Sequence, residues 1–177
     1  MADLVTDPRS SERRAVQVLV ATVLADLAEH ACETYPLECC GFVRADGTVH
    51  RARNIQDDLA HAQAGRYARG AAEGFTLSLE DTLALHQSFE TATPAVVLYH
   101  SHPDVGAYFS AEDRDKALFD GQPVLPVQHL VLDAQADGVR GAKLFGWNGA
   151  DFACTASFVF SAPAAPSPLS EQVNGTL

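Results

Sequence analysis

The spacing of apolar and polar positions predicts a chain in which strands and helices alternate. Apolar positions in 22–34 fall on one helical face, and two further helices are expected from Ser78 to about Phe89 and from Ser110 to about Phe119. Apolar runs without helical spacing predict strands at 16–20, 38–43, 48–54, 74–78, 95–99, 128–133, 140–147 and 151–160. This alternation is typical of the α/β class, in which helices pack on a central sheet.

Polar and proline-rich stretches set the expected boundaries. Residues 1–13 are polar and are expected to be flexible, and the Pro/Ala/Ser-rich residues 161–177 are expected to be disordered. Residues 14–160 then form one domain. Inside it, 55–73 has no clean period and predicts a long surface loop, and 100–109 predicts a loop directly after the buried strand 95–99.

Composition narrows the possible functions. The 177 residues are 47% hydrophobic and 20% charged, which indicates one globular domain. With 12 basic and 23 acidic residues the net charge is −11, so the chain repels polyphosphate and no nucleic-acid partner is expected. The longest apolar stretch, 15–25, is too short to cross a membrane, and its acidic flanks disfavour a signal peptide. No membrane partner is therefore expected. Four cysteines without a CxxC pair favour buried, reduced thiols in a cytoplasmic protein.

The candidate chemistry lies in His100-Ser101-His102-Pro103 and the following Ser110 to Asp113. In an extended segment residues i and i+2 point to the same side, so His100 and His102 can face one metal ion. Asp113, about one turn into the next helix, can add a carboxylate and leave a fourth position for water, as in catalytic zinc sites. The Ser-x-x-Asp spacing equally fits a helix capping box without any metal. Glu112 and Asp115 remain alternative carboxylates.

Two segments resemble the JAMM/MPN metalloprotease family. Residues 100–115 (HSHPDVGAYFSAEDRD) are similar to its H-x-H-x7-S-x-x-D motif, and 35–42 (YPLECCGF) is similar to the segment that carries its catalytic glutamate, here Glu38. The resemblance covers about residues 16–150. It implies a cytidine-deaminase-like α/β fold with a mixed central sheet flanked by helices. One departure is Phe109, which stands where proline is common.

The resemblance also implies a role for each motif residue. His100, His102 and Asp113 would hold one Zn²⁺ with a bound water. Glu38 would be the general acid/base that takes a proton from this water, and Ser110 would help to stabilise the oxyanion. The implied enzyme is a stand-alone bacterial isopeptidase, similar to deubiquitinases. Its substrate would be the (iso)peptide bond after the flexible C-terminal tail of a ubiquitin-like or sulfur-carrier protein.

Other functions fit the sequence less well. A non-catalytic MPN scaffold or binding module for a ubiquitin-like partner is the main alternative, and the five filled motif positions argue against it. The H-E-x-x-H, G-x-S-x-G and P-C-x-x-C motifs are absent from the sequence, which argues against classical zinc proteases, serine hydrolases and nucleoside deaminases. Precursor processing, deconjugation and amino-acid release remain alternative reactions of the implied enzyme.

Several residues outside the motif have open roles. Tyr108 and Phe109 either contact the substrate or pack their loop down, and Asn54 is expected to be a turn residue rather than a substrate contact. Residues 55–73 and 120–127 flank the motif and are hypothesised to grip the substrate tail. The remaining histidines are isolated in the sequence and are expected to be ordinary surface or core residues: His30, His50, His61, His86 and His129.

Overall fold

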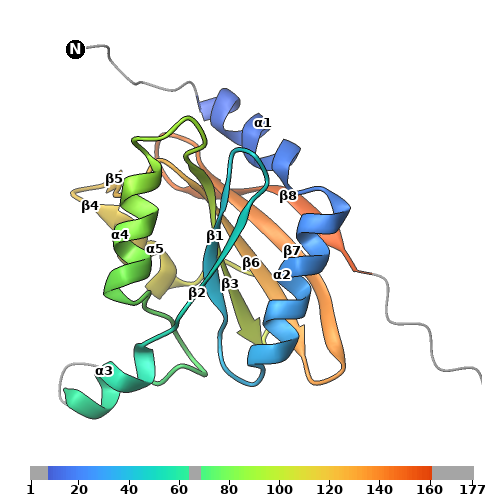
Figure 1. Ribbon diagram of the computed structural model, residues 1–177, viewed down its shortest axis with the longest axis vertical. Helices are drawn as coiled ribbons and strands as arrows, with labels where there is room; N and C mark the ends of the chain where they lie inside the picture. Colours follow the sequence, from blue (N-terminus) through green and yellow to red (C-terminus); the bar gives the residue numbers. More distant parts are fainter. Residues whose placement is uncertain (1–7, 64–68, 161–177) are drawn as a thin grey trace, which may run out of the picture.

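The computed structural model describes residues 8–63 and 69–160, which form a six-stranded mixed sheet flanked by helices (Figure 1). The helices are α1 (Pro8–Val18), α2 (Ala21–Thr34), α3 (Gln56–Ala62), α4 (Leu79–Ser88) and α5 (Ala111–Ala117). The strands are β1 (Cys40–Arg44), β2 (Val49–Ala52), β3 (Ala95–Pro103), β4 (Leu118–Phe119), β5 (Gln122–Pro123), β6 (Gln128–Gln135), β7 (Gly138–Trp147) and β8 (Phe152–Val159). The predicted α/β class with a mixed central sheet is confirmed.

The order of strands in the main sheet is β2-β1-β3-β6-β7-β8, and β4 pairs with β5 in a separate hairpin. β3 and β6 run parallel, and the other neighbouring pairs are antiparallel. β3 therefore lies inside the sheet, and Figure 1 shows β1 and β3 between α2 and α4. Because helices cover both faces, every residue of β3 before Pro103 is buried, as the unbroken apolar run predicted.

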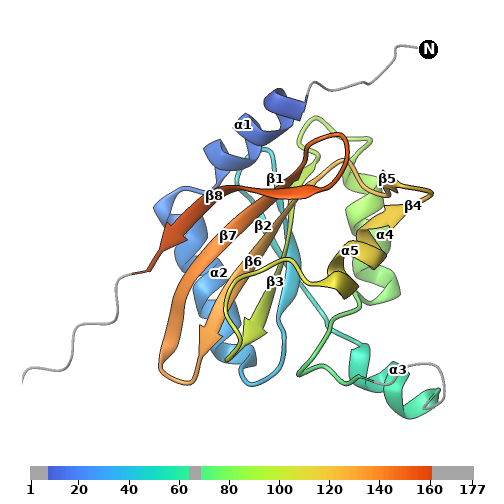
Figure 2. The ribbon, with the colours of Figure 1, turned by 180° about the vertical axis from the view of Figure 1, so that it is seen from behind.

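Alternate residues of the strands build a separate core on each face. Val97 and Tyr99 of β3 pack with Leu27 and Ala31 of α2 on one side, while Leu98 packs with Leu85 of α4 on the other. Burial of each large apolar side chain contributes about 1.5–3 kcal/mol to folding. The second face continues below α5, where Ala117 meets an aromatic cluster of β7 and β8. Figure 2 shows α5 on this side of the sheet, together with the segment that leads to it from β3.

The strand predicted at 16–20 is wrong. α1 runs to Val18 and begins at Pro8, so it also includes residues 8–13 of the segment expected to be flexible. Ala15, Val18 and Leu19 are buried whereas Val16 and Val20 are 41% and 52% exposed, and this is helical rather than alternating spacing. Residues 1–7 and 161–177 lie outside the described residues, so the terminal boundaries stay predictions.

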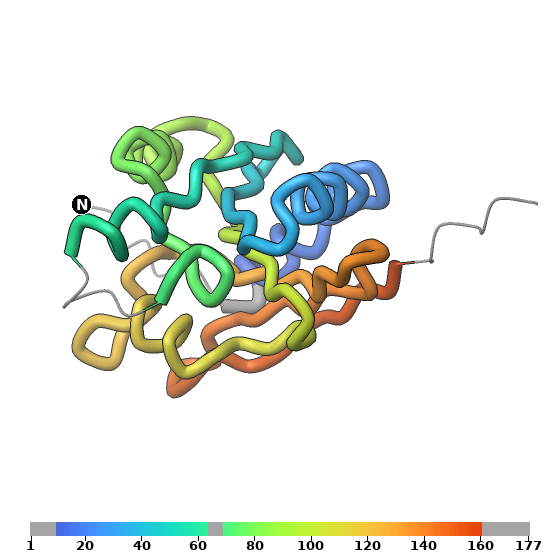
Figure 3. Tube along the Cα trace, turned by 90° about the horizontal axis from the view of Figure 1, so that it is seen from below, coloured from blue at the N-terminus to red at the C-terminus, as the bar shows by residue number. Residues whose placement is uncertain are grey.

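The segment 55–73 is not a continuous loop, because α3 occupies seven of its residues. Figure 3 shows α3 and the end of β8 at opposite sides of the molecule. Residues 64–68 lie outside the described part of the chain. The strand expected at 74–78 is reduced to one isolated bridge between Asn54 and Leu77. The helix expected to reach Phe119 ends at Ala117, and β4 begins at the next residue, Leu118.

Among the described residues, no single helix is both long and apolar enough to cross a membrane. Only α1 and α2 taken together satisfy that test of length and composition, and they are bent by 75° at their junction.

Candidate metal centre and catalytic cleft

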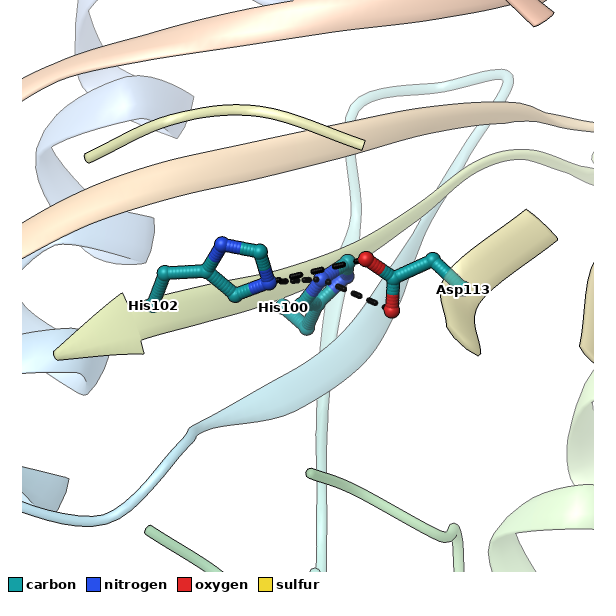
Figure 4. A group of neighbouring side chains, drawn as sticks. All are labelled: His100, His102 and Asp113. Atoms are coloured by element: carbon teal, nitrogen blue, oxygen red, sulfur yellow. Dashed lines mark hydrogen bonds and ion pairs between the residues drawn. The ribbon is translucent and has the colours of Figure 1, made fainter. Parts of the chain in front are cut away.

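Both motif histidines lie on β3. The strand extends to Pro103 rather than ending at Tyr99, because parallel pairing with β6 continues through His100 opposite Val131 and His102 opposite Asp133. The two imidazoles therefore extend from the same side of the strand, and their Nε2 atoms are 3.1 Å apart (Figure 4). Each histidine is at least 95% buried, with exposed fractions of 1% and 5%.

Asp113 reaches the same point from the first turn of α5 (Figure 4). Its Oδ1 is 3.4 Å from Nε2 of His100, and its Oδ2 is 3.5 Å from Nε2 of His102. Of the two rival carboxylates, Glu112 instead forms ion pairs with Arg69 and Lys116, and Asp115 is exposed. The geometry therefore selects Asp113 as the carboxylate that faces the histidines.

A helix cap fixes the position of Asp113. The Ser110 hydroxyl accepts a hydrogen bond from the Asp113 backbone N–H at 3.0 Å, and the backbone N–H of Ser110 donates to Oδ2 of Asp113 at 2.9 Å. The hydroxyl also donates to the same Oδ2 at 2.7 Å. This is the capping box that the spacing allowed, so the capping and metal-ligating interpretations describe the same two residues and are compatible.

The donor set fits a zinc ion. The three candidate ligand atoms lie within 4.8 Å of one another, and Zn–N bonds of about 2.0–2.1 Å can join two nitrogens at the observed separation. Burial lowers the pKa of His100, which favours the neutral imidazole that a ligand needs. Burial alone would also lower the pKa of His102, but its contacts with Asp113 and Glu38 raise it in the metal-free protein. Burial alone would raise the pKa of Asp113, but hydrogen bonds with the two imidazoles and Ser110 hold it well below its usual range. Nδ1 of His100 is buried without a protein partner.

Glu38 precedes β1 and is only 5% exposed. Burial raises the pKa of its carboxyl to about 7, against the opposing effect of His102. The side chain borders a cleft of about 450 Å³ that Ser110, His102 and Asp113 also line. His100 and Asp113 face an adjoining apolar cavity of about 220 Å³. The structure thus brings all five motif residues to one place, whereas a larger hollow of about 600 Å³ beside α1 contains none of them.

Aromatic side chains hold the histidines in place. Phe75 stacks on His100 with 4.6 Å between ring centroids, and the ring of Tyr108 meets His102 edge-on at 4.8 Å. Lys116 in turn donates to the backbone carbonyl of Phe75 at 3.1 Å. Sequence reasoning missed Phe75 and Lys116, since neither belongs to the motif and their contacts join residues far apart in the chain.

The structure separates the two aromatic residues of the loop before α5. Tyr108 is 47% exposed and lines the cleft. Phe109 instead packs against Phe145 and Phe152, with ring centroids 5.5 and 4.9 Å away. The residue that replaces the common proline is therefore the one that packs the loop onto the sheet.

The two cysteines beside Glu38 are poor nucleophiles. Cys39 and Cys40 are buried, and burial raises the pKa of the Cys39 thiol to about 12. Cys32 and Cys154 are exposed, so the expectation that all four thiols are buried is wrong, and all four are free. The isolated histidines have partners elsewhere, such as Tyr99 for His30 and Asp81 for His50, and none belongs to the metal cluster.

Comparisons with known proteins identify the family of the chain. Residues 20–140 match the family model described as prokaryotic homologs of the JAB domain. The desampylase of Haloferax volcanii is 27% identical over 135 residues, which cover 74% of this chain and 84% of the relative. The solution structure of a protein from Desulfitobacterium hafniense matches with a TM-score of 0.52 at 19% identity, covering 76% of this chain and 86% of the other, which is a likeness of fold. Since the family model matches more than half of this chain, the chain belongs to the prokaryotic JAB/MPN domain family.

Proposed function

We propose that the protein is a zinc-dependent isopeptidase that hydrolyses the bond after the C-terminal tail of a ubiquitin-like or sulfur-carrier protein. The observation that carries the proposal is the convergence of two buried imidazoles and the Asp113 carboxylate beside a cleft that also contains a buried glutamate. His100, His102 and Asp113 would hold the metal. A zinc ion bound there supplies a Lewis acid that lowers the pKa of a water molecule and polarises a carbonyl group.

Glu38 and Ser110 supply the remaining chemistry. Glu38 accepts a proton from the attacking water and delivers it to the leaving amine, and its buried carboxyl borders the cleft in which both transfers would occur. The Ser110 hydroxyl donates a hydrogen bond to the carbonyl oxygen as negative charge develops on it. In the free protein this hydroxyl donates to Asp113, so the substrate oxygen would replace the carboxylate as its acceptor.

The substrate class rests on the relative and on the shape of the cleft. The name of the Haloferax relative, desampylase, supports a ubiquitin-like protein as substrate. The cleft is open and polar, with Arg69, Glu73 and Lys116 along its walls, and such a surface suits an extended, flexible tail. Of the two segments hypothesised to grip the tail, 55–73 contributes to the cleft, while 120–127 reaches only the adjoining apolar cavity through Leu125.

The proposal is tested with carrier proteins joined through their C-terminal tail either to a reporter or to a lysine side chain. We expect cleavage that a chelator abolishes and added zinc restores. Glu38→Gln should retain zinc and lose about 10²–10⁴-fold in kcat, because the general acid/base is absent. Glu90→Gln is the matched control, since Glu90 is exposed and does not line the cleft.

Two results would contradict the proposal. A folded, zinc-loaded Glu38→Gln protein with unchanged cleavage would exclude the mechanism. A wild-type protein that binds zinc and the carrier but cleaves neither substrate would support the scaffold alternative instead.

A further inference from the structure

The side chain of Asn54 makes the full set of four hydrogen bonds that an amide can form. Its Nδ2 donates to the carbonyl oxygens of Glu38 at 3.0 Å and of Gly74 at 3.1 Å. Its Oδ1 accepts from the backbone N–H groups of Gln56 at 3.0 Å and of Thr76 at 3.1 Å. With both donors and both acceptors used, Asn54 has nothing left to offer a substrate, which agrees with its interpretation as a turn residue.

These bonds join Glu38 to the wall of the cleft. Glu38 lies two residues before β1 begins at Cys40, so the register of β1 does not include it. Its backbone is held from both sides by the same segment: its N–H donates to the carbonyl of Ala71 at 2.7 Å, and its carbonyl accepts from Asn54. Gly74, the other carbonyl partner of Asn54, lines the cleft together with Glu38.

We propose that Asn54 is a positioning residue for Glu38, acting through the two carbonyl groups that its amide nitrogen holds together. This inference rests on the proposed role of Glu38 in hydrolysis. Through Asn54 the distance between the glutamate and the cleft wall at Gly74 is fixed before a substrate binds. Since displacement of a catalytic group by about 1 Å can cost about a hundredfold in rate, such a connection acts on turnover more than on substrate binding.

The chain offers a matched pair of variants. Asn54→Asp keeps an oxygen for the N–H groups of Gln56 and Thr76 but replaces the donor to Glu38 and Gly74 with a carboxylate oxygen, which repels their carbonyls. The control is Gln56→Met, because the Gln56 side chain also makes two hydrogen bonds to this segment, with the Arg69 carbonyl and the Thr76 hydroxyl. Gln56 is 3% exposed and its side chain makes no contact with Glu38 among these hydrogen bonds.

Steady-state kinetics on the carrier fusion gives the first test. We expect Asn54→Asp to lower kcat by about tenfold to a hundredfold while KM changes less than about threefold. Gln56→Met should leave kcat within about threefold of wild type, even if it lowers the thermal stability of the protein as much as Asn54→Asp does. Equal losses of kcat in the two variants would mean that Asn54 serves only the stability of the segment, and the inference would be overturned.

Hydrogen exchange in the zinc-free protein gives a second test that needs no activity. In Asn54→Asp the Glu38 amide should exchange at least about tenfold faster than in wild type, while the Thr76 amide keeps its protection. In Gln56→Met the Glu38 amide should exchange as in wild type. Unchanged Glu38 exchange in Asn54→Asp would overturn the inference. A wild-type enzyme without cleavage would overturn the proposed function, and the exchange comparison would still decide whether Asn54 holds Glu38.

Discussion

At the residue scale, the burial of Glu38 has a measurable consequence for the zinc-free protein. Burial raises the pKa of its carboxyl to about 7, above the value of about 4.3 expected in an unfolded chain. The folded state therefore favours the protonated form. The contribution to stability is complete below the unfolded pKa and is lost as the pH rises through about 7.

Glu38→Gln should remove this pH dependence, because glutamine stays neutral. We expect the free energy of unfolding of zinc-free wild type to fall relative to Glu38→Gln as the pH rises from about 4 to 7. Urea denaturation of both proteins over that range measures the difference. A difference that stays constant with pH would contradict the burial of an ionisable carboxyl at this position.

The motif residues could be located from the sequence, but the residues that hold them in position could not. Spacing places His100 and His102 on one side of a strand, and the structure has this arrangement. Spacing alone does not say whether Glu112, Asp113 or Asp115 is the carboxylate that faces the histidines. In the structure the orientation of α5 directs Asp113 toward them. Asn54 lies 16 positions from Glu38 in the sequence, and Phe75 lies 25 positions from His100. Only the folded backbone brings such residues together.

At the scale of the elements, the start of α4 depends on a single carboxylate. Asp81 bonds the Ser78 hydroxyl, Nε2 of His50 at 2.7 Å and the backbone N–H of Arg53 at 3.0 Å, so it connects α4 with β2 and the residue after it. Burial works to raise the pKa of Asp81, and these hydrogen bonds outweigh it and lower the pKa below its usual value.

Asp81→Asn should destabilise the protein by about 1–3 kcal/mol at neutral pH, since charge-assisted hydrogen bonds are lost. A lowered pKa in the folded state gives stability that is present above the unfolded pKa of about 3.9 and is lost as the pH falls through the folded value. The variant should therefore show a weaker loss of stability in acid, measured by chemical denaturation. Glu80→Gln, at the exposed neighbouring position, is the control, and an equal effect there would exclude the specific role of Asp81.

Helices and strands could be predicted where the sequence has a clear hydrophobic periodicity or a residue that starts or ends an element. The α2 helix, the Ser78 cap and strands β6 to β8 follow the pattern closely. The prediction of a strand at 16–20 was wrong because a short apolar stretch does not distinguish a strand from the end of a buried helix. α3 was missed because its seven residues contribute a single fully buried side chain, Gln56, and so give no apolar periodicity.

At the scale of the whole molecule, a metal bound at the candidate site would join the central strand to a helix on the face of the sheet. Two candidate ligands come from β3 and one from α5, so zinc should stabilise the folded state. At a free zinc concentration of about 100 times Kd the gain is about 2.7 kcal/mol, and each kcal/mol raises Tm by about 2–4 °C in a chain of this size.

Asp113→Asn should lose most of this shift in Tm, and Glu112→Gln should keep it, because Glu112 pairs with Arg69 and Lys116 instead. The loss of zinc affinity should exceed the roughly 10–100-fold typical of removing a residue that only supports a ligand. Thermal scans with and without zinc, and competition with a chelator, measure both quantities. A zinc-dependent rise in Tm that survives in Asp113→Asn would place the metal elsewhere.

The Ser110–Asp113 capping box has a consequence for how related sequences are interpreted. Because these two side chains start α5 through hydrogen bonds that need no ion, folding alone would preserve them in a relative that had abandoned hydrolysis. A Ser-x-x-Asp pair is therefore poor evidence of activity. The side chains of His100 and His102 cap no helix and instead direct their Nε2 atoms to Asp113, so their replacement is the change that would mark an inactive relative.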